Sequence, residues 1–186
     1  AQVLESGLDA MCLTPPADAP ERWLRFLQLI EKWNRTHNLT RIVEPVDMVR
    51  LHVLDSLTVQ RHLRPGPLLD VGTGAGVPGM VLAIGEPDRA VDLIDSARKR
   101  VVFCQFAIGQ LGLENTLVTH ARADRFAPAK CFANVVSRAV SSLGDLIRWT
   151  EAVQAPGTRV IVMKGQHPVR EVEELQAIGE NADLVK

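Results

Sequence analysis

The sequence predicts an α/β fold in which a mostly parallel sheet is flanked by helices and preceded by an N-terminal helical extension. From residue 68 onward, short apolar runs alternate with longer helical segments, which is typical of strands joined by crossover helices. Before that point, apolar residues recur at helical spacing only. A glycine-rich turn follows the first apolar run, as it does where a strand passes into a helix beside a ligand. We therefore expect a helical extension over residues 1–64 and a sheet domain over residues 65–186.

The composition is that of a soluble globular protein. Hydrophobic residues make up 46% and charged residues 23% of the 186 residues, enough for a sizeable core. The net charge of −1 excludes nucleic-acid binding through overall charge, so a polyanion site would be a local patch. No apolar run reaches the roughly 20 residues of a membrane helix, and no signal peptide is visible. We expect a cytoplasmic monomer without membrane association. Its three cysteines lack metal-ligand spacing, which predicts reduced thiols and no metal site.

The N-terminal third predicts helices. Residues 1–20 contain three prolines and predict a short helix or coil followed by a turn. Glu21–His37 predicts an amphipathic helix, because Trp23, Phe26, Leu27, Ile30 and Trp33 recur at helical spacing. A second helix is expected over Val46–Leu63, with an apolar stripe of Val46, Val49, Val53 and Leu57 and with Arg50, His52, Asp55 and Ser56 on its other side. His52 shares a face with Ser56, and we interpret it as a hydrogen-bonded interface histidine.

The remaining elements alternate. Strands are expected at Leu68–Val71, Ala90–Ile94, Thr116–Thr119, Ala133–Ser137 and Arg159–Met163, and helices at Val77–Ile84, Ala97–Leu111, Ser142–Val153 and Val169–Ile178. Right-handed crossovers and a strand-order switch place ligands beyond the carboxyl ends of such strands. The loops that follow the strands are therefore where we expect the chemistry.

The loop after the first strand is the strongest functional signal. Glycines at positions 72, 74, 76 and 79 follow Asp70, the acid near the strand end. Glycine allows a positive φ and lets the backbone approach a ligand closely. So many glycines exceed the needs of a tight turn, and we interpret the loop as a ligand-binding loop.

The register of these glycines distinguishes two kinds of cofactor. Residues 74–79 fit G-x-G-x-x-G, which alone would favour NAD or FAD. A dinucleotide fingerprint begins directly at the strand end, however, and here that glycine is Gly72, while Val77 stands three residues after Gly74. The unit Asp70-x-Gly72-x-Gly74-x-Gly76 instead favours S-adenosylmethionine, which has no pyrophosphate and needs separate polar partners for its amino-acid end, ribose and adenine.

Polar residues follow three further strands. Asp95 is placed to accept hydrogen bonds from a ribose diol, although it would also suit the start of the next helix. Ala123 and Asp124 lie in the loop after the third strand, where backbone groups and an acid could read an adenine edge. Arg138 ends the fourth strand and could pair with a carboxylate or a phosphate, or form a surface salt bridge.

Several segments together resemble one family. They are Lys32-Trp-Asn-Arg-Thr-His-Asn-Leu-Thr40, His52-Val-Leu-Asp-Ser56, Leu69-Asp-Val-Gly-Thr-Gly-Ala-Gly-Val-Pro-Gly79, Leu93-Ile-Asp-Ser-Ala-Arg-Lys-Arg100, Val136-Ser-Arg-Ala139 and Met163-Lys-Gly165. In this order they resemble the glucose-inhibited division protein B family, the 16S rRNA guanine-N7 methyltransferases. The resemblance implies a Rossmann-like S-adenosylmethionine-dependent methyltransferase domain from residue 65. It also implies two further strands that would close the sheet, and the sequence ends before them, at Lys186.

The resemblance also implies site residues. Cofactor contacts would be Gly72, Gly74, Val77, Ala123, Asp124 and Arg138, with Asp95 as the ribose acid. Lys99, Arg100 and Lys164, with Arg98 as a further possibility, would contact RNA phosphates. On their own, residues 98–100 are more often a solvated helix face.

The implied substrate is a guanine in the decoding-region loop of 16S rRNA, free or in a small ribosomal subunit or assembly intermediate. Guanine N7 carries a lone pair and no proton, so we assign no catalytic acid or base. Two alternatives use the same fold: an NAD- or FAD-dependent oxidoreductase, and a non-enzymatic RNA-binding or ribosome assembly protein. The glycine register argues against the first, and the intact loop with Asp95 and Arg138 argues against the second.

Overall fold

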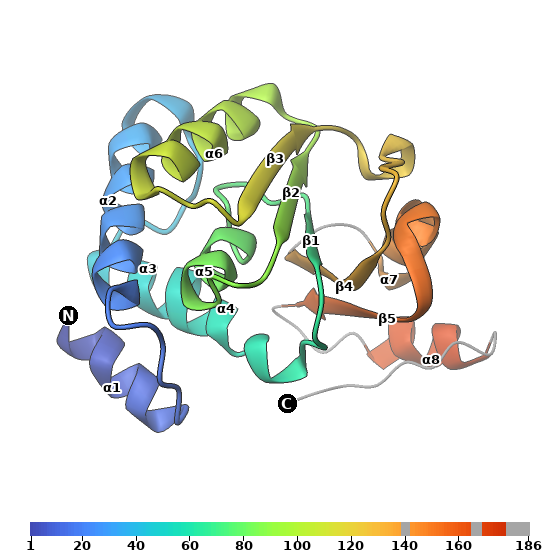
Figure 1. Ribbon diagram of the computed structural model, residues 1–186, viewed down its shortest axis with the longest axis horizontal. Coiled ribbons are helices and arrows are strands. Elements are labelled where there is room, and N and C mark those ends of the chain that lie inside the picture. Colours follow the sequence, from blue (N-terminus) through green and yellow to red (C-terminus); the bar gives the residue numbers. More distant parts are fainter. Residues whose placement is uncertain (139–141, 165–168, 178–186) are drawn as a thin grey trace.

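The computed structural model describes residues 1–138, 142–164 and 169–177, and it contains a five-stranded sheet between two layers of helices (Figure 1). The strands are β1 (Leu68–Val71), β2 (Val91–Asp95), β3 (Thr116–His120), β4 (Phe132–Arg138) and β5 (Gln154–Met163). Their order is β3-β2-β1-β4-β5 and every neighbouring pair is parallel, which confirms the predicted sheet. The order reverses at β1, so the carboxyl ends of β1, β2 and β4 meet at the switch point where α/β folds bind ligands.

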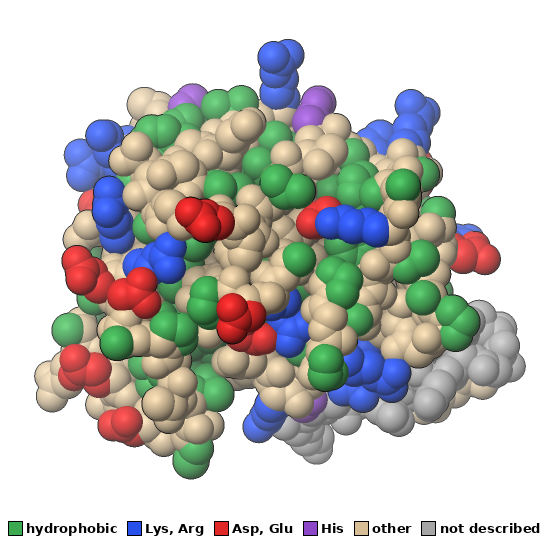
Figure 2. All heavy atoms as spheres, in the orientation of Figure 1, with side chains coloured by type: hydrophobic (Ala, Val, Ile, Leu, Met, Phe, Trp, Pro, Cys, Tyr) green, Lys and Arg blue, Asp and Glu red, His purple; other side chains and the backbone are tan. Residues whose placement is uncertain are grey.

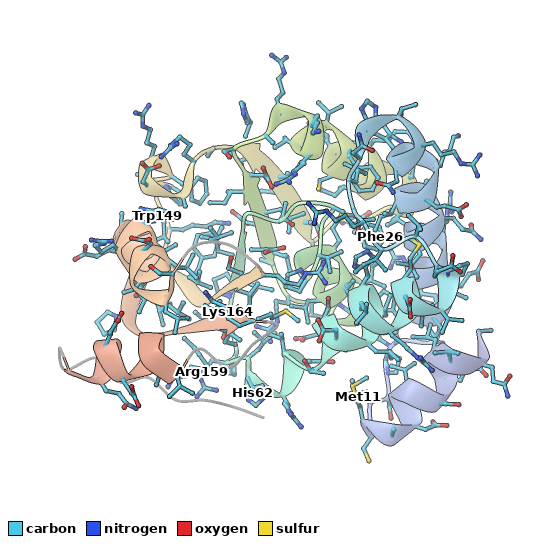
Figure 3. The ribbon with its side chains drawn as sticks, turned by 180° about the vertical axis from the view of Figure 1, so that it is seen from behind. Met11, Phe26, His62, Trp149, Arg159 and Lys164 are labelled. Carbon is cyan, nitrogen blue, oxygen red and sulfur yellow. The ribbon has the colours of Figure 1, made fainter. Side chains whose placement is uncertain are left out.

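One face of the sheet is covered by α5 (Gly79–Gly85) and α6 (Arg98–Leu111), and α2 (Ala19–His37) packs against both of these helices (Figure 1). The first helix, α1 (Gln2–Ala10), packs against residues 49–54. The apolar stripe predicted for α2 is confirmed, because Trp23, Phe26 and Ile30 are completely buried. The Trp23 indole Nε1 also donates to the Val81 carbonyl at 3.0 Å and so joins α2 to α5. Extension and sheet therefore share one core, into which Phe26 points (Figure 3).

The opposite face carries a smaller core beneath α7 (Leu143–Thr150). The short helices η3 (Ala123–Arg125) and η4 (Glu151–Val153) and the helix α8 (Val169–Ala177) belong to the C-terminal half of the chain. Alternate residues of the central strands divide between the cores: Leu68 and Leu93 contribute to the larger one, Leu69 and Ile94 to the smaller. This division is the period-two pattern of a sheet covered on both faces.

The segment Val46–Leu63, predicted as one regular α-helix, is helical but irregular. The segment consists of α3 (Pro45–Met48), the π-helical η1 (Val49–Leu54), α4 (Asp55–Leu57) and the 3-10 turn η2 (Gln60–His62). The Asp55 N–H donates to the Arg50 carbonyl, five residues back, so the π turn alters the α-helical spacing. The predicted stripe is buried at Val49, Val53 and Leu57, whereas Val46, which precedes the π turn, is 46% exposed. His52 and Ser56, expected on the other side, are buried as well.

Other element boundaries also differ from the prediction, most of them by one or two residues. Helix α5 begins at Gly79 rather than at Val77, because the N–H groups of Gly76 and Val77 both donate to the Thr73 carbonyl within the loop. Strand β5 begins at Gln154 rather than at Arg159, and its pairing with β4 is irregular near Phe132. The expected end of the last helix, at Ile178, lies outside the described residues.

Surface charge is mixed on the face drawn in Figure 2, where acidic and basic side chains of the described residues are interspersed. At the lower edge, Arg159 on β5 donates to the His62 carbonyl at 2.7 Å, and Figure 3 shows the two residues side by side. Within the described residues, no helix has the length and apolar character needed to cross a membrane.

Candidate functional site

The glycine loop between β1 and α5 has the backbone conformation that the sequence predicts. Gly72, Gly74 and Gly76 have φ values of 68°, 61° and 84°, a region that residues with a Cβ rarely adopt. The N–H groups of Gly72 and Thr73 donate to the Ile94 carbonyl at 2.9 and 3.1 Å, which fixes the loop against the end of β2. Gly72 and Gly74 are partly exposed. Their backbone is therefore the part of the loop that a ligand can reach.

Val77 occupies a different environment from these glycines. Its side chain is only 3% exposed and belongs to the larger core. A cofactor contact at Val77 would thus have to involve its backbone, not its side chain.

Asp70, in β1, is hydrogen-bonded to both ends of the glycine loop. Its side chain is fully buried, and its Oδ2 accepts from the Thr73 hydroxyl at 2.7 Å and from the Gly79 N–H at 2.8 Å. Its Oδ1 is buried without a hydrogen-bond partner among the described residues. Burial raises the pKa of the Asp70 carboxyl to about 6, against the opposing effect of these two donors. The free oxygen is an acceptor that suits a cationic ligand group or a water molecule.

Asp95 joins the end of β2 to the same loop. It is 2% exposed, its Oδ2 accepts from the Gly74 N–H at 2.9 Å, and its Oδ1 accepts from the Ala97 N–H at 2.8 Å. Arg100 approaches Oδ2 at 3.4 Å. Since each carboxylate oxygen can accept about two hydrogen bonds, Oδ1 retains capacity for a ligand hydroxyl. Asp95 can therefore both accept from the N–H that precedes α6 and accept from a ribose hydroxyl, so the two predicted roles are compatible.

Arg138 ends β4, and the N-terminal segment holds it in place. Its Nη1 donates to the Leu51 carbonyl at 2.7 Å, and its Nη2 lies 3.3 Å from His52 Nδ1. Burial raises the pKa of both Asp55 and Asp70, and the positive charge of Arg138 opposes this rise. Both carboxyl groups therefore interact with the guanidinium. Arg138 is half-buried, with its guanidinium held by η1.

Ala123 and Asp124 lie in η3, at the far side of the site. The Asp124 carboxylate is held by Arg122 through two contacts, Nε to Oδ1 at 3.0 Å and Nη2 to Oδ2 at 3.1 Å, and this pairing lowers its pKa. Both residues line a cavity of about 340 Å³ between η3 and α7. Trp149, labelled on α7 in Figure 3, lines it from the other side.

The basic residues predicted to contact RNA lie on α6 and after β5. Lys99 is exposed at the start of α6, and its Nζ donates to the His37 carbonyl at 3.2 Å. Arg100 turns toward Asp95, and Lys164 directly follows β5, where Figure 3 labels it.

Sequence reasoning missed Thr40 and Leu51, which contact His52 and Arg138. The interpretation of His52 as a hydrogen-bonded interface histidine is confirmed, because it is 1% exposed and Thr40 Oγ1 lies 3.2 Å from its Nε2. No spacing in the sequence connects residue 52 to residue 138. Among the described residues, no group of three or more His, Cys, Asp or Glu side chains could hold a metal ion.

This sheet order, with a glycine loop at the switch point and buried acids in β1 and β2, defines a Rossmann-like domain of the methyltransferase type. Solved structures share the fold. A coclaurine N-methyltransferase bound to N-methylheliamine and SAH is 14% identical, with a TM-score of 0.56 over 74% of this chain and 42% of that chain. A ribosomal protein L11 methylase from Lactobacillus delbrueckii is 17% identical, with a TM-score of 0.54 over 69% and 67%.

Sequence comparison identifies the family. Residues 20–182 match the family described as rRNA small subunit methyltransferase G. Curated relatives carrying the name ribosomal RNA small subunit methyltransferase G are 43% identical in Methylobacillus flagellatus, over 92% of this chain and 83% of the relative, and 41% identical in Methylococcus capsulatus, over 94% and 85%. The chain belongs to the rRNA small subunit methyltransferase G family.

Proposed function

We propose that this protein transfers a methyl group from S-adenosylmethionine to N7 of a guanine in the decoding-region loop of 16S rRNA. The observation that carries the proposal is the match of residues 20–182 to the rRNA small subunit methyltransferase G family. Curated relatives with that name, 43% and 41% identical to this chain, support an rRNA substrate. The choice of guanine N7 and of the decoding-region loop rests on the resemblance described under Sequence analysis.

The residues around the glycine loop fit S-adenosylmethionine. The accessible backbone of Gly72 and Gly74 would lie along the cofactor, and the spare acceptor capacity of Asp95 Oδ1 suits a ribose hydroxyl. The unpartnered Oδ1 of Asp70 suits the cationic amino-acid end, directly or through water, and Arg138 suits its carboxylate. When bound, the sulfonium supplies a methyl group with a neutral thioether as leaving group.

Ala123 and Asp124 are the proposed adenine contacts. Because Arg122 already occupies the Asp124 carboxylate, we infer that the backbone of this loop, rather than the acid, would read the adenine edge. The adjoining cavity of about 340 Å³ leaves room on the α7 side of the loop.

The protein's contribution to methyl transfer is then positioning and charge. Guanine N7 needs no general base, so no side chain has to remove a proton before attack. The buried carboxylates of Asp70 and Asp95 favour positive charge nearby, and the product base is a cation. Lys99 and Lys164 are the proposed phosphate contacts, while Arg100, which pairs with Asp95, would link the RNA face to the cofactor site.

Ligand binding and rRNA mapping test the proposal. S-adenosylhomocysteine should raise the melting temperature of the protein, and NADH should not. Stabilisation by NADH alone would instead identify an oxidoreductase, and stabilisation by neither compound would favour a non-enzymatic RNA-binding protein.

Mass mapping of 16S rRNA from cells with and without the protein should then locate one methylguanine. Asp95→Ala should abolish that methylation, while the exposed control Glu114→Ala should not. Incubation with naked 16S rRNA and with small subunits in parallel shows which of the two is the substrate.

A further inference from the structure

The N-terminal segment reaches the cofactor site through one buried histidine. His52 lies in the π-helical η1, and Arg138 lies at the carboxyl end of β4. Arg138 Nη2 and His52 Nδ1 are 3.3 Å apart, while Nη1 of the same guanidinium donates to the Leu51 carbonyl at 2.7 Å. Two adjacent residues of η1 therefore hold both terminal nitrogens of Arg138. Single π-helical turns are frequent at functional sites, where they displace residues from regular helical spacing.

The contacts of His52 fix the position of its proton. An arginine can only donate, so Nδ1 must be the accepting nitrogen of a neutral imidazole. The proton then resides on Nε2, which donates to Thr40 Oγ1 at 3.2 Å. Burial and the charge of Arg138 lower the pKa of His52 to about 4 against the opposing effect of the Leu51 backbone, so the imidazole stays neutral around pH 7. Asp55 and Asp70 are the carboxyl groups that interact with the same guanidinium.

Thr40 is itself held by the end of α2. Its N–H donates to Asn34 Oδ1 at 2.9 Å, and its hydroxyl oxygen also accepts from the Ile42 N–H at 3.1 Å. A continuous path of hydrogen bonds thus runs from Asn34 through Thr40 and His52 to Arg138. Asn34 and Thr40 also line a surface groove of about 300 Å³, so the path joins the outer surface to the carboxyl end of β4.

We propose that His52 is a positioning residue. It orients the Arg138 guanidinium toward the cofactor, and its own ring is oriented by the hydrogen bond to Thr40. The inference rests on the proposed function, because it assumes that Arg138 contacts S-adenosylmethionine. It gives the segment from Asn34 to His52 a role in cofactor binding in addition to covering the sheet. A guanidinium without these acceptors would rotate among several rotamers, and ordering it would then cost binding free energy.

Two substitutions of His52 separate its two contacts. In His52→Asn the amide oxygen lies near the position of Nδ1 and can still accept from Arg138, but the side chain is too short to reach Thr40. In His52→Gln the amide lies near the position of Nε2 and reaches Thr40, but Arg138 loses its acceptor. We expect His52→Gln to weaken S-adenosylhomocysteine binding about tenfold, in the range of a hydrogen bond to a charged group. His52→Asn should stay within about threefold of the wild type.

Calorimetry in the wild-type and Arg138→Ala backgrounds provides the decisive comparison. With Arg138 removed, neither His52 variant should change S-adenosylhomocysteine affinity further, because the contact that distinguishes them is gone. Equal weakening by both variants, or an undiminished effect in the Arg138→Ala background, would mean that His52 is merely structural. Thr40→Val provides a second measurement if the His52 variants unfold. Like His52→Asn, it removes only the contact between Thr40 and His52, so it should weaken binding by no more than about threefold and only in the wild-type background. A larger loss, or the same loss in the Arg138→Ala background, would overturn the inference.

The same data distinguish the two proposals. If the wild type binds S-adenosylhomocysteine but Arg138→Ala binds it equally well, the role of His52 is refuted while the cofactor assignment stands. If the wild type does not bind S-adenosylhomocysteine, the proposed function fails, and the inference fails with it.

Discussion

Gly79 is where the loop, the buried acid and the sheet meet, and replacing it by alanine tests that arrangement directly. An added Cβ would lie 2.2 Å from Leu93 Cδ2 and 2.7 Å from Asp70 Oδ2, closer than real Cβ contacts. The strain is steric, since Gly79 has no positive φ and opens helix α5. Relief requires movement of Leu93 in the core or of the Asp70 carboxylate that accepts the Gly79 N–H.

The expected cost follows from these contacts. Overpacking a core costs about 1–3 kcal/mol, and weakening a hydrogen bond to a carboxylate adds about 1.5–3 kcal/mol. The intrinsic helix preference for alanine returns about 1 kcal/mol, so we expect a net loss of roughly 3 kcal/mol in the free energy of unfolding. For a domain of this size, that corresponds to a melting temperature about 6–12 °C lower.

Gly109→Ala is the matched control. A Cβ at Gly109, in helix α6, would meet no atom within 4 Å, so this variant should gain about 0.5–1 kcal/mol and melt slightly above the wild type. Urea unfolding and thermal melts of the three proteins provide the measurement. A Gly79→Ala protein that melts with or above the wild type would show that the packing around Asp70 is looser than described.

Three further outcomes are expected. His52 has a pKa of about 4 when folded, against 6.5 for an exposed histidine, so its contribution to stability is full above pH 6.5 and is lost as the pH falls toward 4. His52→Asn should therefore lose less stability than the wild type between pH 7 and pH 5 in urea titrations. Equal losses of stability in the two proteins would contradict the pKa assigned to His52. Asp70, with its pKa raised to about 6, has the opposite effect on stability, but it is present in both proteins and cancels in the comparison. Trp23→Phe leaves the buried Val81 carbonyl without its indole donor and should cost about 1–3 kcal/mol in the same assay, whereas an unchanged midpoint would mean that another donor replaces it. Lys99→Ala should weaken rRNA binding and reduce the slope of log affinity against log salt by about 0.9 if the ammonium contacts one phosphate, and an unaltered slope would remove Lys99 from the interface.

The sheet and its loop could be predicted because their determinants are local in the sequence. Apolar runs such as Leu68–Val71 bound by turn residues indicate buried strands, and glycines at positions 72, 74 and 76 take the positive φ that the turn requires. The position of Asp95 at the end of β2 follows from the same local pattern, whereas its role in binding stays a prediction. Local patterns of this kind fix the half of the site formed by β1 and β2.

The other half depends on contacts between distant residues. Arg138 is held by Leu51 and His52, more than 80 positions earlier, and no periodicity encodes such a pairing. The π-helical turn that places these two residues looks like ordinary helix in the sequence, since it differs only in its hydrogen-bond register. The roles of Ala123, Asp124 and Lys164 in binding stay predictions.

Strand order also governs how a growing chain can assemble this site during synthesis. Strands β1, β2 and β3 are consecutive in sequence and pair to one side of β1, so the loop, Asp70 and Asp95 can come together early. The other edge of β1 stays open until β4 has been made, and Arg138 is the last residue of that strand. Leu51 and His52 are synthesised long before Arg138, so their contacts with its guanidinium can form only after β4 has been made. Because domains fold as their segments emerge, the contact with Arg138 marks the completion of the cofactor site, and a nascent chain shorter than this carries an unpaired central strand.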